Sequence, residues 1–385
     1  MRPARENARM PEFDVAIIGA GIAGASLAYR LANSQRVLLL ERESQPGHHA
    51  TGRSAAMFME SYGPHAVRAL TRASRAFYEQ PPAGFGEALL TPRGALYLAT
   101  HGQAALLDET RHNLLTTGTV VDTLDASAVL ARVPCLRPEV VLGGLYEHGA
   151  QDVDVHALHQ GFLRGLRASG GVLRTQAEVV AARRDGHGNG WTLRLADGDA
   201  LQARTVVNAA GAWADEVAAV CGAAPVSLVP HRRSAFTFAA PEGVDVSAWP
   251  AVAGVDESYY FKPDAGRLLG SPANADPTVP HDVVPEELDI AQGIHQIESV
   301  STLRIRRPAS TWAGLRSFVR DGEPVIGWDA QCPGFFWLAG QGGYGIQSAA
   351  GASELAAALW RGAPLPAELQ RHGVDAQALA PQRLR

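Results

Sequence analysis

Lysine is almost absent from this chain. Of its 34 basic residues only Lys262 is a lysine, and the arginines that make up the rest are scattered along the 385 residues. The 39 acidic residues give a formal net charge of −5. Polybasic membrane patches and nucleic-acid footprints need clustered basic charge, which this sequence does not have. These partners are therefore excluded, and a small-molecule ligand is expected.

Cysteine is also scarce. Cys135, Cys221 and Cys332 lie far apart and form neither a C-x-x-C pair nor a zinc-binding spacing. His156 and His159 are three residues apart on an expected helix, but no third ligand accompanies them. The sequence therefore predicts a reducing compartment and no metal site.

Long apolar runs are missing as well. The longest, from Val15 to about Tyr29, is interrupted by glycines and is too short for a membrane span. The first residues are charged and lack the apolar segment of a secretory signal, with Met1 and Met10 as alternative starts. We expect a cytoplasmic protein, with peripheral attachment to the inner membrane as the alternative.

Glycine, by contrast, is abundant, and three glycines form a nucleotide-binding motif. The segment "DVAIIGAGIAG" predicts a strand over Val15–Ile18, a G-x-G-x-x-G turn, and a helix that continues to Ala32. In this motif Gly19 allows the tight turn, Gly21 lets a pyrophosphate approach the backbone, and Gly24 lets the helix pack on the strand. The alternative is a glycine-rich turn with a purely structural role.

Three further segments support a dinucleotide site. The strand Val37–Leu40 ends at Glu41, where a carboxylate would accept hydrogen bonds from a ribose. The strand Thr205–Asn208 leads into a turn of small residues, and the strand Phe335–Ala339 leads into "GQGGYG" and a helix. A helix N-terminus stabilises the negative charge of reduced flavin, so this pattern favours FAD over NAD.

Several longer motifs carry a family resemblance. The segments "RSAAMF", "SYYFKPDAGRLLGSPAN", "TWAGLRSF" and "GGYGIQ" resemble the FAD-dependent D-amino acid oxidase and glycine oxidase superfamily, and most closely its bacterial D-arginine dehydrogenase branch. The resemblance covers essentially the whole chain. It implies an α/β fold, in which a discontinuous Rossmann-like FAD-binding domain joins an α+β substrate-binding domain with a mainly antiparallel sheet.

The resemblance also implies domain bounds and the mode of cofactor attachment. The FAD-binding domain would comprise residues 12–85, 145–218 and 318–372, and the substrate-binding domain residues 86–144 and 219–317, followed by a C-terminal tail, 373–385. Some relatives attach the flavin through a cysteine near the segment "TWAGLRSF", which contains none here. FAD is therefore expected to be bound non-covalently.

The motifs and the resemblance together predict the residues that contact FAD. These are Gly19, Gly21, Ala23, Gly24, Glu41, Arg42, His49, Thr51, Arg53, Ser54, Ala55, Ala56, Val179, Ala210, Gly211, Trp213, Gly342, Gly343, Tyr344, Gly345, Ile346 and Gln347.

Oxidation of an amino acid requires a clamped α-carboxylate, a neutral amine, and a Cα hydrogen aimed at the flavin. Arginine forks onto carboxylates, and the resemblance assigns Arg316 and Arg233 to this clamp. The alternative for each is a structural salt bridge, and Arg232 competes with Arg233. The resemblance adds Tyr62 and Tyr260 as catalytic tyrosines.

Two more residues complete the predicted site. By resemblance, the carbonyl group of Gly343 would accept a hydrogen bond from the substrate amine, and Gln347 would lie beneath the flavin. No general base is evident, and none is required where the amine loses its proton to water.

The chain departs from the D-arginine branch in the pocket that would hold the substrate side chain. Met57 and Met59 replace a histidine and a threonine, and Ala95 replaces the glutamate that receives a cationic side chain. Ala251 and Ala253 replace bulkier apolar residues. Glu60 is a possible substitute carboxylate, although strand alternation would point it away from the methionines. The two methionines and three alanines predict a preference for apolar or aromatic D-amino acids over D-arginine.

Three functions remain open at this point. The first is a D-amino acid dehydrogenase that passes electrons to a quinone or another carrier. A dehydrogenase is favoured because the lysine that assists oxygen in some oxidases has no evident counterpart here, and a D-amino acid oxidase is the alternative. The second is an oxidase of secondary or cyclic amino acids of the sarcosine, glycine or proline type. The third is a non-catalytic flavoprotein subunit, which would leave Arg233 and Arg316 unexplained.

Overall fold

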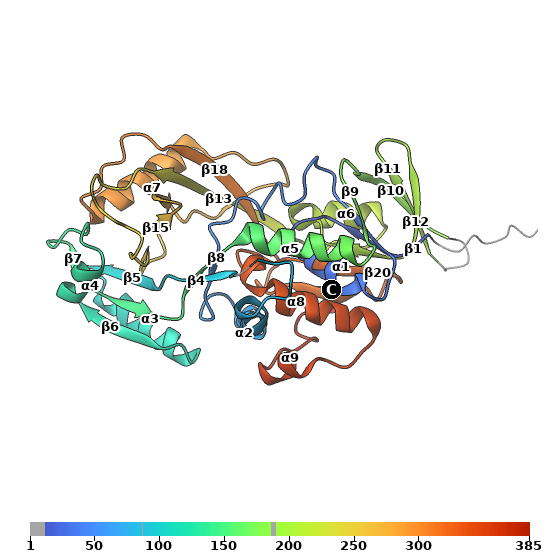
Figure 1. Cartoon of the computed structure of the whole chain (residues 1–385), viewed down its shortest axis with the longest axis horizontal. Coiled ribbons are helices and arrows are strands. Elements are labelled where there is room, and N and C mark those ends of the chain that lie inside the picture. The colour runs from blue at the N-terminus through green and yellow to red at the C-terminus, as the bar shows by residue number, and fades with distance from the viewer. Residues whose placement is uncertain (1–11, 87, 186–189) are drawn as a thin grey trace, which may run out of the picture.

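The computed structural model describes residues 12–86, 88–185 and 190–385, and both alternative starts lie outside this part of the chain. Figure 1 shows two lobes side by side, one containing β1, β12 and β20 and the other containing β5, β7, β13 and β18. A small sheet lies between them, formed by β3 (Met57–Phe58), β4 (Leu90–Pro92) and β8 (Gln151–Val153).

The first lobe is built on an eight-stranded sheet with a parallel centre. Its neighbouring strands run in the order β20 (Phe335–Ala339), β12 (Ala200–Asn208), β1 (Phe13–Ile18), β2 (Val37–Leu40) and β9 (Val172–Arg174), all parallel. Three further strands join it in antiparallel pairings: β19 (Val325–Trp328) on β20, and the hairpin of β10 (Val179–Arg184) and β11 (Trp191–Leu195) on β12.

Both faces of this sheet are buried, as expected for parallel strands with continuous apolar runs. Along β1, Val15 and Ile17 pack into one core, and Ala16 and Ile18 pack into the other. The first core is covered by α1 (Ile22–Ala32), α2 (His65–Glu79), α5 (Val155–Ala168) and α8 (Gly345–Arg361), and the second by α6 (Ala214–Val220). A Cβ on Gly351 would lie 2.4 Å from the carbonyl oxygen of Leu70, so this glycine lets α8 approach α2.

The second lobe contains a nine-stranded sheet. Its strands run in the order β17 (Asp276–Pro277), β13 (Val229–Phe238), β16 (Arg267–Ser271), β15 (Tyr260–Asp264), β14 (Ala251–Gly254), β5 (Ala95–Thr100), β7 (Val141–Glu147) and β6 (Val121–Asp125), with β18 (Ser310–Phe318) also on β13. Every pairing is antiparallel except β14 with β5. Side chains of α4 (Ala126–Arg132) and α7 (Glu287–Val300) pack in its apolar core.

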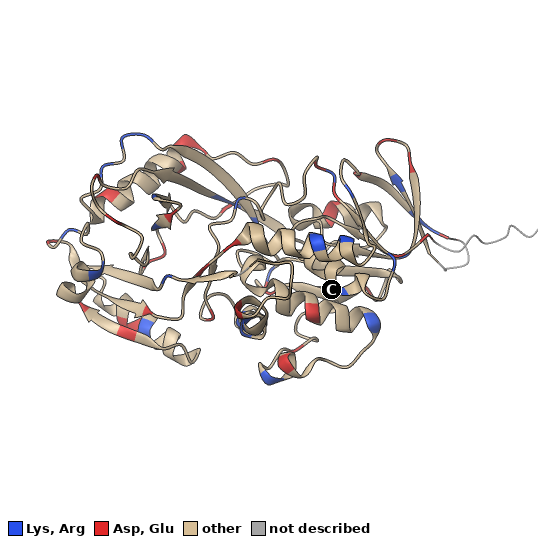
Figure 2. Ribbon diagram, viewed as in Figure 1, with Lys and Arg blue, Asp and Glu red and all other residues tan. Residues whose placement is uncertain are grey.

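The remaining elements are short or peripheral. They are α3 (Ala104–Thr116), α9 (Ala367–Arg371) and the 3₁₀ turns η1 (Gly211–Trp213) and η2 (Pro381–Leu384). Within the described ranges no helix combines the length and the apolar character that a bilayer crossing requires. Figure 2 shows acidic and basic residues interspersed over both lobes.

The predicted fold class, an α/β chain with a Rossmann-like domain and a mainly antiparallel second sheet, is confirmed. The first sheet draws its strands from residues 13–40, 172–208 and 325–339, and the second from 95–147, 229–277 and 310–318. The strand β7 crosses the predicted boundary between residues 144 and 145. The exact domain bounds stay a prediction.

Candidate active site

A cleft of about 420 Å³ opens where the parallel strands of the first sheet end. It is lined by Gly19 after β1, Glu41 after β2 and Ala210 after β12, and it reaches β18 of the other lobe at Arg316. Ligands of open parallel sheets bind in the crevice at the carboxyl ends of the strands. The cleft therefore occupies the position in which a dinucleotide is held.

The glycine turn has the geometry that the motif predicts. Gly19 has a φ of +103°, and a Cβ at this position would lie 2.4 Å from the carbonyl oxygen of Ala209. A Cβ on Gly24 would lie 1.9 Å from the carbonyl oxygen of Gly19, so Gly24 is required for close packing and does not line the cleft. Gly21 lines the cleft and leaves the start of α1 open to a phosphate.

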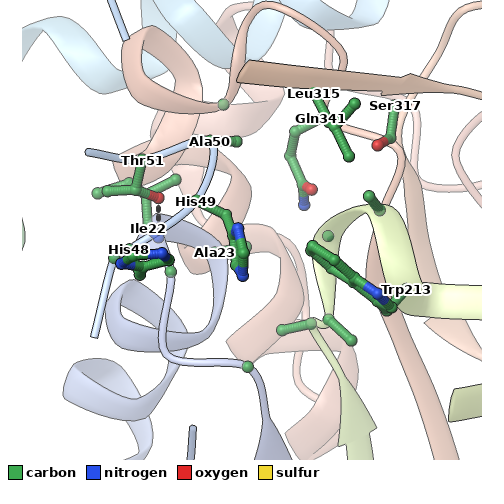
Figure 3. Close-up of a pocket in the computed structure, with 18 of the residues that line it drawn as sticks. Ile22, Ala23, His48, His49, Ala50, Thr51, Trp213, Leu315, Ser317 and Gln341 are labelled. Carbon is green, nitrogen blue, oxygen red and sulfur yellow. Dashed lines mark hydrogen bonds between the residues drawn. The ribbon is translucent and has the colours of Figure 1, made fainter. Parts of the chain in front are cut away.

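Two side chains fix the rim of this turn. The Oγ1 atom of Thr51 accepts a hydrogen bond of 2.9 Å from the backbone N–H of Ile22, drawn as the dashed line in Figure 3. The two carboxylate oxygens of Glu41 accept hydrogen bonds of 3.0 Å from the backbone N–H groups of Ala20 and Glu43. Each oxygen has a second lone pair, so Glu41 can also accept from a ribose.

The far wall of the cleft is aromatic. The ring of Trp213 lies 4.5 Å from that of His49 between centroids, and the guanidinium of Arg42 lies 4.0 Å from the Trp213 ring. Figure 3 shows Trp213 and His49 facing each other, with Gln341 above them. Aromatic rings beside a glycine-rich phosphate site suit the planar rings and the diphosphate of FAD.

Most of the predicted cofactor contacts line this cleft. The residues that do so are Gly19, Gly21, Ala23, Glu41, Arg42, His49, Thr51, Arg53, Ser54, Ala55, Val179, Ala210, Gly211, Trp213, Gly342, Gly343, Gly345 and Ile346. Ala56, Tyr344 and Gln347 are not in its wall, although all three flank it in sequence. The guanidinium of Arg53 is turned to the other lobe, where it donates to the carbonyl oxygens of Val283 and Ala313.

The sequence analysis missed several lining residues. His48, Glu178, Leu315, Ser317 and Gln341 belong to the cleft. Of these, Gln341 lies inside the "GQGGYG" turn and could have been identified there, and its Nε2 atom is buried without a hydrogen-bond partner among the described residues. Glu43, His48 and His49 bring three possible metal ligands within 4.8 Å of one another, but Glu43 and His49 already pair at 2.9 Å.

The two arginines predicted to bind a carboxylate lie on neighbouring strands. In the register of β13 with β18, Arg233 faces Gly314 and His231 faces Arg316, which places both arginines on one side of the sheet. Both line the cleft, together with Tyr260. The Nη1 atom of Arg316 lies 3.5 Å from the hydroxyl of Tyr62. The structure thus gathers all four predicted catalytic residues.

Neither guanidinium is neutralised by a described carboxylate. Arg233 donates from Nε to the carbonyl oxygen of Asn274 at 2.6 Å, and among the described residues Arg316 donates a hydrogen bond only to the Tyr62 hydroxyl. Arg232, by contrast, is paired with three acidic residues, and its Nε lies 3.1 Å from Asp289. Among the described residues, Arg232 therefore forms structural salt bridges, and Arg233 and Arg316 have no acidic partner.

The electrostatics of the pair agree with this assignment. Burial, followed by the like charge of Arg316, lowers the pKa of the Arg233 guanidinium. Burial also lowers the pKa of Arg316, but Tyr62 and Tyr260 more than offset this, so the net shift is upward. Arginine stays protonated in proteins, so two uncompensated positive charges share this site. An anion such as an α-carboxylate would relieve their repulsion.

The loop before α8 closes the site around Arg316. A Cβ on Gly343 would lie 3.0 Å from Nη1 of Arg316, so a glycine lets the loop contact the guanidinium. Gln347 donates from Nε2 to the carbonyl oxygen of Tyr62 and to Oγ1 of Thr71, each at 3.1 Å. Its side chain therefore holds the Tyr62 segment. The Tyr344 ring packs 5.0 Å from that of Tyr62, and burial raises its pKa to about 12.

The three alanines predicted to line the side-chain pocket lie on neighbouring strands of the second sheet. In the register of the second sheet Ala251 lies beside Ala95, and Ala253 lies between Tyr97 and Tyr260. These alanines share a face with the catalytic Tyr260 because directly opposed residues point to the same side. No described alanine of this group lines the main cleft.

The expectation that strand alternation continues from Met57 to Met59 is wrong. The strand ends at Phe58, and the chain then turns, with the N–H of Tyr62 donating to the carbonyl oxygen of Met59 at 3.3 Å. Glu60 is not a substitute carboxylate in this structure, because it lies 2.5 Å from Nε of Arg75 on α2.

The remaining basic residues of interest have structural partners. The ammonium of Lys262 lies 2.6 Å from Asp152, and the Lys262 side chain is 7% exposed. Arg93 contacts the other oxygen of Asp152 at 2.6 Å. His159 donates from Nε2 to the carbonyl oxygen of Ala20 at 2.9 Å and supports the glycine turn, whereas His156 is exposed.

Comparison with known proteins gives the same architecture. Glycine oxidase of Geobacillus kaustophilus is 26% identical over 349 residues, which is 87% of this chain and 89% of that protein. Its crystal structure superposes with a TM-score of 0.80, covering 94% and 98% of the two chains. The crystal structure of an iminodiacetate oxidase from a Chelativorans species, 25% identical, also gives a TM-score of 0.80 and covers 93% of this chain and 98% of that one.

Human mitochondrial dimethylglycine dehydrogenase is 28% identical over 268 residues. The match covers 67% of this chain but only 30% of that protein, so the chain spans less than a third of this relative. A family model described as FAD dependent oxidoreductase matches residues 14–359, and the cleft described above has the glycine turn, the acidic residue and the aromatic wall that fit this cofactor. The chain therefore belongs to the FAD dependent oxidoreductase family, and its cofactor is FAD.

Proposed function

We propose that this chain oxidises D-amino acids to imino acids, which water then converts to 2-oxo acids. The observation that carries the proposal is the pair of guanidinium groups, Arg233 and Arg316, which lack a described acidic partner and line the FAD cleft beside Tyr260. Such a pair binds an α-carboxylate through fork-like hydrogen bonds. The bound FAD supplies the hydride acceptor for the Cα–H bond.

Each residue then has a specific task. Arg316 and Arg233 hold the carboxylate, and the Tyr62 hydroxyl, 3.5 Å from Arg316, donates to the same anion. Tyr260 lies on β15 at the edge of the cleft and orients the substrate from the other side. The Gly343 carbonyl group accepts from the amine. Because an amine can lose its proton to water before hydride transfer, no dedicated base is needed.

The cofactor is proposed to be held without a covalent bond to cysteine. Cys135, Cys221 and Cys332 are all buried, and none of them lines the cleft. Burial raises the pKa of Cys221 to about 12, which makes its thiolate scarce at neutral pH.

The side-chain preference is proposed to be apolar or aromatic rather than cationic. Ala95 stands where the D-arginine branch carries the glutamate that pairs with the substrate, and Glu60 is engaged by Arg75. Removing one partner of a buried charge pair costs about 2–5 kcal/mol of binding, so a guanidinium would bind poorly. Met57, Met59, Ala251 and Ala253 provide apolar surface of adaptable shape.

The electron acceptor is proposed to be a quinone or another carrier rather than oxygen. Lys262, the sole lysine in the sequence, is paired with Asp152 at 2.6 Å and is not in the wall of the FAD cleft. No lysine is therefore available to promote the reaction of the flavin with oxygen.

A second candidate is oxidation of glycine or N-substituted glycines with the same carboxylate clamp. It is favoured by the names of the relatives, which refer to glycine, dimethylglycine and iminodiacetate. Against this candidate, glycine derivatives have no side chain to contact Ala251 and Ala253, which are proposed to receive one.

Steady-state kinetics on a substrate panel separate these proposals. The panel contains D-methionine, D-leucine, D-phenylalanine, D-arginine, D-lysine, sarcosine and glycine. We expect the three apolar D-amino acids to have the highest kcat/KM. Higher values for D-arginine and D-lysine would contradict the pocket assignment, and higher values for sarcosine would favour the second candidate.

A further inference from the structure

A buried carboxyl group lies on the same face of the second sheet as the predicted pocket. Glu147 is the last residue of β7 and stands directly opposite Ala95 of β5, which in turn stands beside Ala251 of β14. Directly opposed residues project to the same side of a sheet. Glu147, Ala95 and Ala251 therefore form a row across three neighbouring strands.

A second row runs parallel to the first. It consists of Tyr97 on β5, Ala253 on β14 and Tyr260 on β15. Neighbouring strands are about 4.8 Å apart, so Glu147 and Tyr260 are separated by three such spacings, about 14 Å between backbones. Between these two ends the rows contain Ala95, Ala251 and Ala253, together with Tyr97, whose hydroxyl reaches Glu147.

The carboxyl group is only partly satisfied within the protein. Glu147 is 2% exposed, and its Oε2 atom accepts hydrogen bonds from Oγ of Ser61 at 2.8 Å and from the hydroxyl of Tyr97 at 3.1 Å. No described residue donates to Oε1, and no described arginine, lysine or histidine forms an ion pair with Glu147. Oε1 is not one of the described side-chain atoms that are fully enclosed without a partner, so it remains open to a donor from a ligand.

Glu147 is linked to the carboxylate clamp through one short segment. Its partner Ser61 precedes Tyr62, whose hydroxyl lies 3.5 Å from Arg316. A substrate held by Arg316 and oriented by Tyr260 would extend its side chain along the alanines toward Glu147. Glu147 would then lie at the far end of that side chain.

We propose, on the basis of the function proposed above, that Glu147 forms the polar end of the side-chain pocket and selects D-amino acids whose apolar or aromatic side chain ends in a neutral O–H or N–H donor. Two neutral hydroxyls already donate to this carboxyl, and no described cation accompanies it. Burial raises the pKa of Glu147, which makes it a poorer partner for a cation than an exposed glutamate.

Matched substrate pairs test this selection in the FAD-loaded protein. D-Tyrosine and D-phenylalanine differ by one hydroxyl, and D-glutamine and D-methionine are of similar length but differ in the terminal donor. In the wild type we expect kcat/KM to favour the donor-bearing member of each pair by about tenfold or more. Because each ratio compares two substrates on one protein, a general loss of activity cancels.

Two variants and one control connect the ratio to Glu147. Glu147→Leu should bring both ratios to about one, because the acceptor that distinguishes the two members of each pair is removed. Glu147→Gln keeps an acceptor oxygen and should retain part of the preference even if the leucine variant does not fold. Glu60→Gln is the matched control, because Glu60 faces Arg75 and should leave both ratios unchanged.

The outcomes separate this proposal from the one on which it rests. Wild-type ratios of one or below, or an equal fall for both members of a pair in the Glu147 variants, overturn the role of Glu147 and leave D-amino acid oxidation intact. A preference for D-arginine and D-lysine overturns the selection of neutral donors. If no D-amino acid reduces the flavin, the proposed function is wrong and the selection falls with it.

Discussion

Replacement of Arg316 by leucine should disable substrate capture. The guanidinium of Arg316 lines the FAD cleft, contacts the Tyr62 hydroxyl at 3.5 Å, and has no ion pair with a described carboxylate. Losing one partner of a buried charge pair costs about 2–5 kcal/mol. Because about 1.4 kcal/mol corresponds to a factor of ten, kcat/KM should fall by roughly 30-fold to 5,000-fold.

Anaerobic stopped-flow reduction of the flavin measures this effect directly. It separates the apparent dissociation constant of the substrate from the limiting rate of reduction, and the absorbance of the bound flavin shows whether FAD is still present. Arg316→Lys should fall between the wild type and Arg316→Leu, because lysine keeps the charge but loses the planar fork.

Arg232→Leu is the matched control. Arg232 is on β13 next to Arg233 but is paired with Asp276, Glu286 and Asp289. Its loss should lower the thermal midpoint while kcat/KM stays within about threefold of the wild type. Equal effects of Arg232→Leu and Arg316→Leu on kcat/KM, or a change below about threefold for Arg316→Leu, would refute the clamp.

Three other predictions concern the fold, the pH dependence and the acceptor. Gly19→Ala should lower the free energy of unfolding by about 2 kcal/mol or more, because the Cβ would lie 2.4 Å from the carbonyl oxygen of Ala209 and the residue has a φ of +103°. Thermal melting measures this effect, and an unchanged midpoint would be inconsistent with this turn. Burial raises the pKa of Glu147 in the folded state, so its stabilising contribution is complete below the unfolded value of about 4.3 and declines as pH rises toward the folded value. Denaturant titrations measure the free energy of unfolding of the wild type and of Glu147→Gln at each pH. The wild-type value minus the variant value should fall as pH rises from about 4.3, and a rise would contradict a pKa raised by burial. Turnover of D-methionine should require an artificial acceptor, and oxygen consumption equal to turnover without one would show an oxidase.

Local sequence patterns predicted the strands and the glycine turn of the nucleotide half of the molecule. The strand over Val37–Leu40 was predicted with its observed bounds, because a buried parallel strand is a short apolar run between polar residues. Gly19 and Gly24 were predicted correctly because each glycine in the turn has a steric reason that depends only on nearby residues. The same is true of Glu41, which follows directly after its strand.

Contacts between distant segments were not accessible from the sequence. Glu147 lies beside Ala95 because β5 and β7 pair antiparallel across 52 positions, and no local motif marks that register. The turn at Met59 was missed because alternation was extended past the end of a two-residue strand. The sequence likewise could not show which of Arg232 and Arg233 is paired, because the acidic partners of Arg232 lie more than 40 positions away.

The central claim is that Arg233 and Arg316 hold the α-carboxylate of a D-amino acid against FAD. Anaerobic mixing of the FAD-loaded protein with D-methionine, L-methionine or sarcosine tests it most directly, with loss of the visible absorption band of the flavin as the readout. We predict rapid bleaching by D-methionine and none by the other two on the same timescale. Bleaching by L-methionine or sarcosine, with D-methionine inert, would contradict the account.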